Sequence, residues 1–279
     1  MIQIKVGLMD ATGTVEPDVM VAAAAALNVQ VTRDLPQFWN VSASVAYLPN
    51  GNEKVPQGVW PVQLVATLPP DEGRFHQTNN NQPYAKVIVT PGSNEWTIDA
   101  SHETLEMLVD PSGSKLQTST AIAVVDGKIK ETDGQFEYLV EACDPCEAVS
   151  YAYQIGETFV SDFLTPHFYE PNALPGTRYS FTGAIIAPRQ ILPGGYISWI
   201  DPQSDEIQQL FFLDPNKPPK IRNLGSVRRG TSLRAFVDSK TRHFIHSTKR
   251  PSKAGQDKIR QAYLRATNAA AIVRAKHYK

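Results

Sequence analysis

The stretch "IDASHETLEMLVDP", residues 98–111, decides how this sequence is interpreted. Its apolar residues recur at helical spacing and form one stripe, made of Ile98, Leu105 and Val109. Pro111 cannot continue a helix, so it marks the end of the segment. The stretch therefore predicts a helix over 98–110 with one face in the core.

A second stripe on this helix carries side chains that can bind a metal ion. His102, Glu106 and Asp110 are spaced by four residues, which places them along one edge beside the apolar stripe. In zinc hydrolases with a His-Glu-x-x-His motif, two ligands one turn apart hold the metal and the intervening glutamate activates water. By this logic His102 and Glu106 are the ligand pair, and Glu103 is the general base.

The third ligand stays open at this point. Asp110 is the nearest choice, and a ligand from elsewhere in the chain is the alternative, with His76, Glu141 and Asp144 as candidates. Because this set is rich in oxygen, we expect a divalent ion, with zinc first and manganese, iron or calcium as competitors. A solvated helix face with no metal would explain the same letters.

The other predicted elements give an α+β fold. Strands are expected at 2–8, 41–48, 59–67 and 84–90, a helix at 16–39, and a long polar loop at 69–83. Beyond residue 115 the chain is β-rich, with many Gly-Pro connections. We therefore expect a mixed sheet with two main helices, followed by a β-rich second half.

This element order, ending in the His102-Glu103 helix, resembles the N-terminal half of zincin peptidases, especially metzincins, over roughly residues 1–165. The pattern SHExLExLxDP is closest to a group of bacterial and phage-type proteins without an assigned activity. The resemblance implies a zincin-like metal-binding domain over 1–170, completed by a β- and loop-rich part over 171–215. It also implies a zinc-type metallopeptidase.

In the zincin family the strand before this helix is a sheet edge that binds an extended peptide. The resemblance therefore implies Tyr84, Lys86 and Ile88 as substrate-binding residues. The sequence departs from the family at Glu106, which replaces the second histidine, and it lacks the glycine and third histidine of metzincins. An inactive descendant of a peptidase is thus the other outcome of this interpretation.

Charge divides the chain into two regions. Residues 216–279 hold 17 of the 27 Lys and Arg residues but only Asp238 and Asp257 as acids. We interpret 216–279 as a basic extension with a terminal helix over 254–278. Its expected partner is an acidic protein surface, such as another subunit of a homo-oligomer or larger assembly, or else nucleic acid.

The remaining signals concern location and a rival function. No signal peptide and no apolar run long enough to span a membrane is visible, so we expect a cytoplasmic or virion-associated protein. The pair Cys143 and Cys146 supplies only half of a four-ligand zinc site. The rival to the peptidase is a structural or assembly protein of a phage particle or other large complex, which keeps the fold without hydrolysis.

Overall fold

The computed structural model describes residues 3–49, 55–68, 74–79, 81–90, 92–228 and 230–245, without the side chains of 242–245. Its helices are α1 (Pro17–Val29), α2 (Trp96–Val109) and α3 (Leu233–Ile245). Its strands are β1 (Ile4–Asp10), β2 (Ala43–Tyr47), β3 (Val59–Val65), β4 (Arg74–Asn79), β5 (Gln82–Ile88), β6 (Leu116–Val125), β7 (Lys128–Leu139), β8 (Tyr153–Ile155), β9 (Thr158–Val160), β10 (Gly195–Asp201), β11 (Glu206–Phe212) and β12 (Lys220–Gly225). The expected α+β class, with a β-rich second half, is confirmed.

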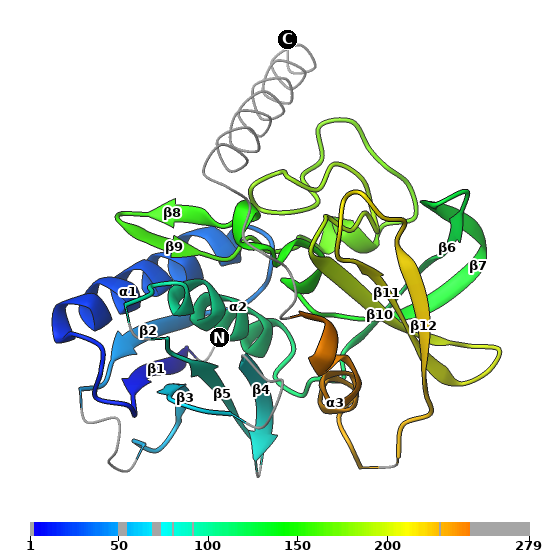
Figure 1. Cartoon of the computed structure of the whole chain (residues 1–279). Helices are drawn as coiled ribbons and strands as arrows, with labels where there is room; N and C mark the ends of the chain where they lie inside the picture. The colour runs from blue at the N-terminus through cyan, green and yellow to red at the C-terminus, as the bar shows by residue number, and fades with distance from the viewer. Residues whose placement is uncertain are drawn as a thin grey trace.

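The first half of the chain is a five-stranded sheet in the order β2-β1-β3-β5-β4. The strands β1, β2, β3 and β5 pair in parallel, and β4 pairs antiparallel with β5. Helices α1 and α2 lie over one face of this sheet (Figure 1). Alternate residues such as Leu8, Leu64 and Val87 are buried, because successive strand side chains point to opposite faces.

The predicted polar loop at 69–83 is wrong, because it contains β4 and the turn into β5. Asn81 takes the left-handed conformation, with a φ of 61°, at the tight turn between the strands. The sequence "RFHQTN" of β4 is too polar to give a strand signal, since its buried members include His76. The edge of the sheet is therefore β4, and β5 is an interior strand.

The helix predicted over 16–39 is present but is not regular to its end. After α1, residues Gln30–Asp34 form a wider π-turn and Leu35–Gln37 a 3₁₀ turn. Pro36 has no amide hydrogen to donate, so a regular helix cannot pass through it. The buried Gln30 side chain donates a hydrogen bond to the carbonyl of Ser161 at 2.9 Å, which ties this irregular turn to the second half of the chain.

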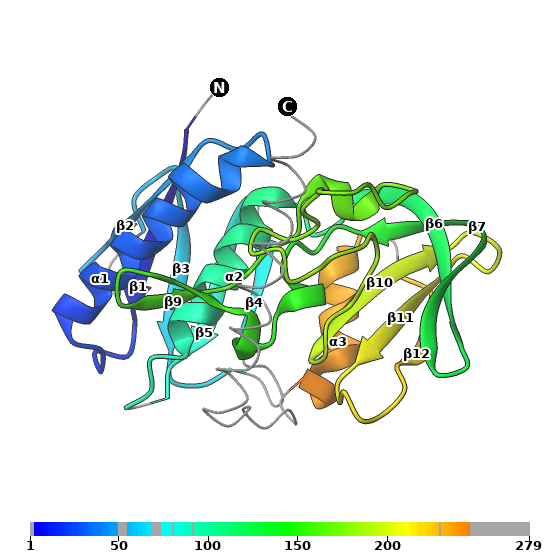
Figure 2. The ribbon, with the colours of Figure 1, turned by 90° about the horizontal axis from the view of Figure 1, so that it is seen from above.

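The second half is built on an antiparallel sheet in the order β12-β11-β10-β7-β6. One hydrophobic core joins the two halves, since Leu105 of α2 belongs to the same buried cluster as Val140, Trp199 and Leu210. Helix α3 lies between β4 and this second sheet, as two views at right angles show (Figures 1 and 2). The carboxyl end of α2 consequently lies between the two sheets.

The predicted boundary at residue 216 does not separate the basic segment from the fold. Strand β12 pairs with β11 across Leu210↔Ile221, and Val237 of α3 is fully buried. The helix expected over 254–278 lies outside the described residues. Among the residues that are described, no helix is long and apolar enough to cross a membrane.

Candidate metal site

Helix α2 is buried on almost every side. His102 is 1% exposed, and Glu103 and Glu106 are 0% exposed. The interpretation of these residues as a solvated helix face is therefore wrong. Burying ionisable side chains is costly unless each finds a partner, so the contacts of these groups determine what the helix does.

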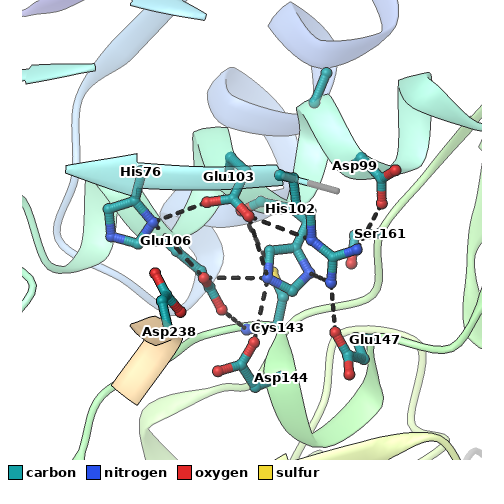
Figure 3. Close-up of polar contacts among 12 residues, drawn as sticks. His76, Asp99, His102, Glu103, Glu106, Cys143, Asp144, Glu147, Ser161 and Asp238 are labelled. Atoms are coloured by element: carbon teal, nitrogen blue, oxygen red, sulfur yellow. Dashed lines mark hydrogen bonds and ion pairs between the residues drawn. The ribbon is translucent and has the colours of Figure 1, made fainter. Parts of the chain in front are cut away.

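Three donor atoms converge beside α2. His102 Nε2 lies 3.1 Å from Glu106 Oε2 and 3.3 Å from Asp144 Oδ1. Asp144 comes from a 3₁₀ turn, η3 (Asp144–Cys146), that follows β7. The amide of Cys143 donates to Glu106 Oε1 at 3.0 Å and so fixes this turn against the helix. Figure 3 shows His102, Glu106 and Asp144 directed toward one another.

Asp110 does not join this group. Its carboxylate accepts hydrogen bonds from Ser112 N at 3.2 Å, Ser112 Oγ at 2.8 Å and Lys115 N at 2.6 Å, and so orders the turn after α2. No set of close potential metal ligands among the described residues includes it. The stripe of three ligands predicted on one helix is thus reduced to His102 and Glu106, because Asp110 lies where the helix ends.

The other three residues considered as a third ligand all lie in the cluster. Donor atoms lie within 4.8 Å of one another in each of four buried groups, which are His102/Glu106/Cys143, His76/Glu103/Glu106, His102/Asp144/Glu147 and Glu106/Glu141/Asp144. Both cysteines are buried and free. Asp144 is the third ligand that the geometry favours, because it alone among the three candidates approaches His102 Nε2 within 4 Å.

Strand β4 brings a second pair of side chains to Glu103. His76 Nδ1 lies 2.9 Å from Glu103 Oε2, and Arg74 Nε lies 3.2 Å from Glu103 Oε1. Arg74 also pairs with Asp99 at 2.6 Å and with Glu147. The sequence carries no signal that marks Arg74, because the polar letters around it predict a loop instead of strand β4.

Arg74 and two carboxylates act in opposite directions on the protonation of His102. The guanidinium has only donors, and its Nη2 lies 3.2 Å from His102 Nδ1, so this ring nitrogen accepts. The proton of a neutral ring then sits on Nε2 and faces Glu106 and Asp144. Burial and Arg74 lower the pKa of His102, but those two carboxylates outweigh them and raise it to about 10. The two carboxylates thus favour a protonated His102 ring, and the Arg74 contact favours a neutral ring with its proton on Nε2. In both forms Nε2 carries a proton, so both correspond to a metal-free state.

Carboxylates outnumber cations in the cluster. The acids are Asp99, Glu103, Glu106, Glu141, Asp144, Glu147 and Asp238, and the cations are Arg74 and Arg234, with His76 and His102 when protonated. Burial raises the pKa of Glu147 to about 7 and that of Asp238 to about 6, although Arg74 and Arg234 oppose these shifts. The cluster therefore favours uptake of positive charge, as protons or as a cation.

The predicted substrate residues do not reach this cluster. Ala85 and Val87 point to the helix side of the sheet with His76, which pairs with Ala85 across the strands. Tyr84, Lys86 and Ile88 alternate with them and face the other side. Both edges of β5 are already paired, so a peptide cannot be added to this strand. The prediction that the edge strand is 84–90 is wrong.

The turn that carries Asp144 rests on Gly195, at the start of β10. A Cβ atom at this position would lie 2.6 Å from the Asp144 carbonyl oxygen and 2.7 Å from that of Pro145. We expect Gly195→Ala to displace η3 and to lower the free energy of unfolding by about 1–3 kcal/mol, measured by urea denaturation. Gly7→Ala is the comparison, since its Cβ would meet side-chain atoms of Leu48 and Val59 rather than backbone. An equal loss in both variants would contradict this role for Gly195.

Comparison with known proteins gives no further guide: no family model, curated protein or solved structure matches this chain.

Proposed function

We propose that this chain binds one divalent metal ion through His102, Glu106 and Asp144, and that it is a metal-dependent peptidase with a zincin-like fold. The observation that carries the proposal is the convergence of these three buried donors within a cluster that has more carboxylates than cations. Zinc fits a set of one imidazole and two carboxylates, and manganese or iron fits it as well.

Several buried polar atoms near α2 make no well-formed hydrogen bond, and this supports a bound cation. Asp144 Oδ1, Glu103 Oε1 and His102 Nε2 are buried and accept or donate no well-formed hydrogen bond within the described structure. Buried polar atoms are rarely left in this state, and a bound ion is one of the groups that can satisfy them. A bound divalent ion would supply Lewis acidity and would neutralise the excess negative charge.

Glu103 supplies the base in this proposal. Its Oε1 lies 4.0 Å from His102 Nε2, so the carboxylate faces the same space as the metal ligands. Burial raises the pKa of Glu103, but the nearby His76, His102 and Arg234 lower it by more. The net pKa of Glu103 is therefore below its usual value, and the carboxylate stays ionised. His76 and Arg74 hold this carboxylate in place as an ion, with Oε1 facing the proposed ligands.

Two features of the fold support a zincin-like peptidase over other hydrolases. The sheet has the four strands expected before the helix and, in addition, an unexpected antiparallel edge strand next to α2. That edge strand is β4, which carries Arg74 and His76 into the site. Helix α3 lies beside the outer edge of β4, so an extended peptide could pair with this edge, next to Glu103, only after α3 moves.

The complete burial of the ligands favours the rival, an assembly protein that keeps the cluster for stability. Substrate cannot reach side chains that are 0–1% exposed unless part of the fold moves. Hydrolysis therefore requires an opening, and a protein that never opens would be structural.

Metal analysis of the purified protein tests the proposal. We expect about one equivalent of zinc, manganese or iron in the wild type after metal is supplied during refolding, and a loss of most of it in His102→Ala. The control is His167→Ala, a half-exposed histidine whose Nδ1 contacts Glu170 rather than the cluster. Equal, negligible metal in the wild type and both variants would remove the metal site and the enzyme with it.

A further inference from the structure

A guanidinium group occupies the centre of the carboxylates. Arg234 Nη1 lies 2.9 Å from Glu106 Oε2, 2.6 Å from Glu141 Oε2 and 3.1 Å from Asp144 Oδ2. The Arg234 side chain is only 4% exposed. Two of its partners, Glu106 and Asp144, are the proposed carboxylate ligands of the metal. The guanidinium thus holds Glu106 Oε2, the same oxygen that faces His102 Nε2, and it holds Asp144 by Oδ2, the oxygen beside the one that faces His102.

Helix α3 is attached at this place by contacts that do not involve the site. The amide of Arg234 donates to the Gly113 carbonyl at 2.8 Å, and the amide of Leu233 donates to Ser114 Oγ at 3.1 Å. Val237 packs into a small apolar cluster with Leu139, Tyr196, Ile207, Phe211 and Leu224. This cluster is separate from the main core, so α3 can separate from it without breaking the main core.

The Arg234 side chain is also braced within α3. Its Nε lies 2.8 Å from Asp238 Oδ1, one helical turn further on. Gly113 leaves the space that this arrangement needs, because a Cβ there would lie 2.8 Å from the Arg234 Cβ. The insertion of Arg234 is therefore supported by the packing of both neighbouring segments.

We propose that Arg234 is a built-in cation that stands in for the metal, so that α3 is a latch and metal binding competes with insertion of Arg234. A divalent ion sits about 2.0–2.6 Å from its oxygen ligands, so an ion on Glu106 Oε2 would lie close to Arg234 Nη1, which is 2.9 Å from that oxygen, and the two positive charges would repel. Arginine stays charged at all ordinary pH values, so it neutralises the carboxylates whatever the pH. Metal entry then requires Arg234 to withdraw and so exposes the site.

This inference rests on the proposed metal site, and it explains why that site is closed. With Arg234 inserted, α3 covers the ligands, and Arg74 Nη2 lies 3.2 Å from His102 Nδ1, the nitrogen that carries the proton when Nε2 binds a metal. Linkage requires that whatever favours withdrawal of α3 favours metal binding by the same factor. A partner that binds the withdrawn state of α3 more tightly than the inserted state would therefore open the site.

Titration of Mn²⁺ and Zn²⁺ into the metal-free full-length protein tests this competition. We expect Arg234→Met to bind the metal on the order of tenfold to a hundredfold more tightly than the wild type. Arg228→Met is the matched control, since it removes the same charge from an exposed position on the approach to α3. It should bind metal as the wild type does.

A second variant covers the case in which Arg234→Met is too unstable to titrate. Val237→Ala loosens the apolar attachment of α3 but leaves Arg234 and every proposed ligand in place. We expect it to bind metal more tightly and faster than the wild type. Thermal unfolding gives an independent measure, because metal should raise the melting temperature more in Arg234→Met than in the wild type.

The outcomes separate the two proposals. The latch would be overturned, and the metal site kept, if wild type, Arg234→Met and Val237→Ala bind metal with equal affinity while His102→Ala binds none. No metal binding in any of these proteins would overturn the metal site and the latch together. Tighter binding in Arg234→Met and Val237→Ala, absent from Arg228→Met, supports both.

Discussion

Arg74→Met is expected to lower the free energy of unfolding by about 3–5 kcal/mol, the usual result of removing one partner of a buried ionic contact. Arg74 pairs with Asp99, Glu103 and Glu147, and its side chain is 18% exposed. Methionine fills a similar volume but leaves these carboxylates without their cation. The loss should therefore come from unneutralised charge rather than from a cavity.

The loss in Arg74→Met should depend on pH. Burial already raises the pKa of Glu147 to about 7, while Arg74 opposes this rise, so removing Arg74 raises the pKa further. An unfolded glutamate has a pKa of about 4.3. The folded variant then binds more protons than the unfolded chain between these values, and its stability falls as the pH rises through that range.

Urea denaturation of wild type, Arg74→Met and Arg228→Met at pH 5 and pH 8 measures this effect. We expect Arg228→Met to be within about 0.5 kcal/mol of the wild type, because Arg228 is exposed. The loss in Arg74→Met should be larger at pH 8 than at pH 5. A small loss, or one that is equal at the two pH values, would show that Arg74 does not neutralise the cluster.

Glu103→Gln is expected to lower the rate of peptide hydrolysis by about 10²–10⁴-fold while metal content stays unchanged. Glutamine has nearly the same shape as glutamate but cannot accept a proton from water. It also keeps a carbonyl oxygen as acceptor for Arg74 or His76. Glu157→Gln is the control, since Glu157 is exposed in the turn between β8 and β9.

The assay uses a casein-like protein and a peptide library, with and without a chelator. It is run in the wild type and in Arg234→Met, because the latch would hide activity in the wild type. Activity lost in Glu103→Gln and with chelator, but kept in Glu157→Gln, is the expected result. A metal-loaded Arg234→Met protein that cleaves no peptide would reject the peptidase and favour the assembly protein.

Much of the first half could be read from local patterns. The strands around Leu8, Val45 and Val62 and the helix around His102 have alternating or helical apolar spacing, which is a property of short stretches. Strand β4 was missed because its polar letters give no such spacing. Its place at the edge comes only from its pairing with β5.

The candidate site divides in the same way. His102, Glu103 and Glu106 were identifiable because a helix fixes their relative positions within one turn. Asp144 was one of several candidates, since nothing local states how far η3 lies from α2. Arg74 and Arg234 were not identifiable, because the local sequence does not distinguish an arginine buried in an acidic cluster from one exposed to solvent.

The sequence by itself determined the α+β class, the HE helix and the residues on it that can act together. Local spacing specifies these features, because backbone geometry alone relates residues a few positions apart. The tertiary structure alone decided that α2 is buried, that Asp144 and not Asp110 faces His102, and that Arg234 lies among the carboxylates. These features depend on contacts between segments up to 128 positions apart in the chain, whose distance in space is set by the packing of the whole core.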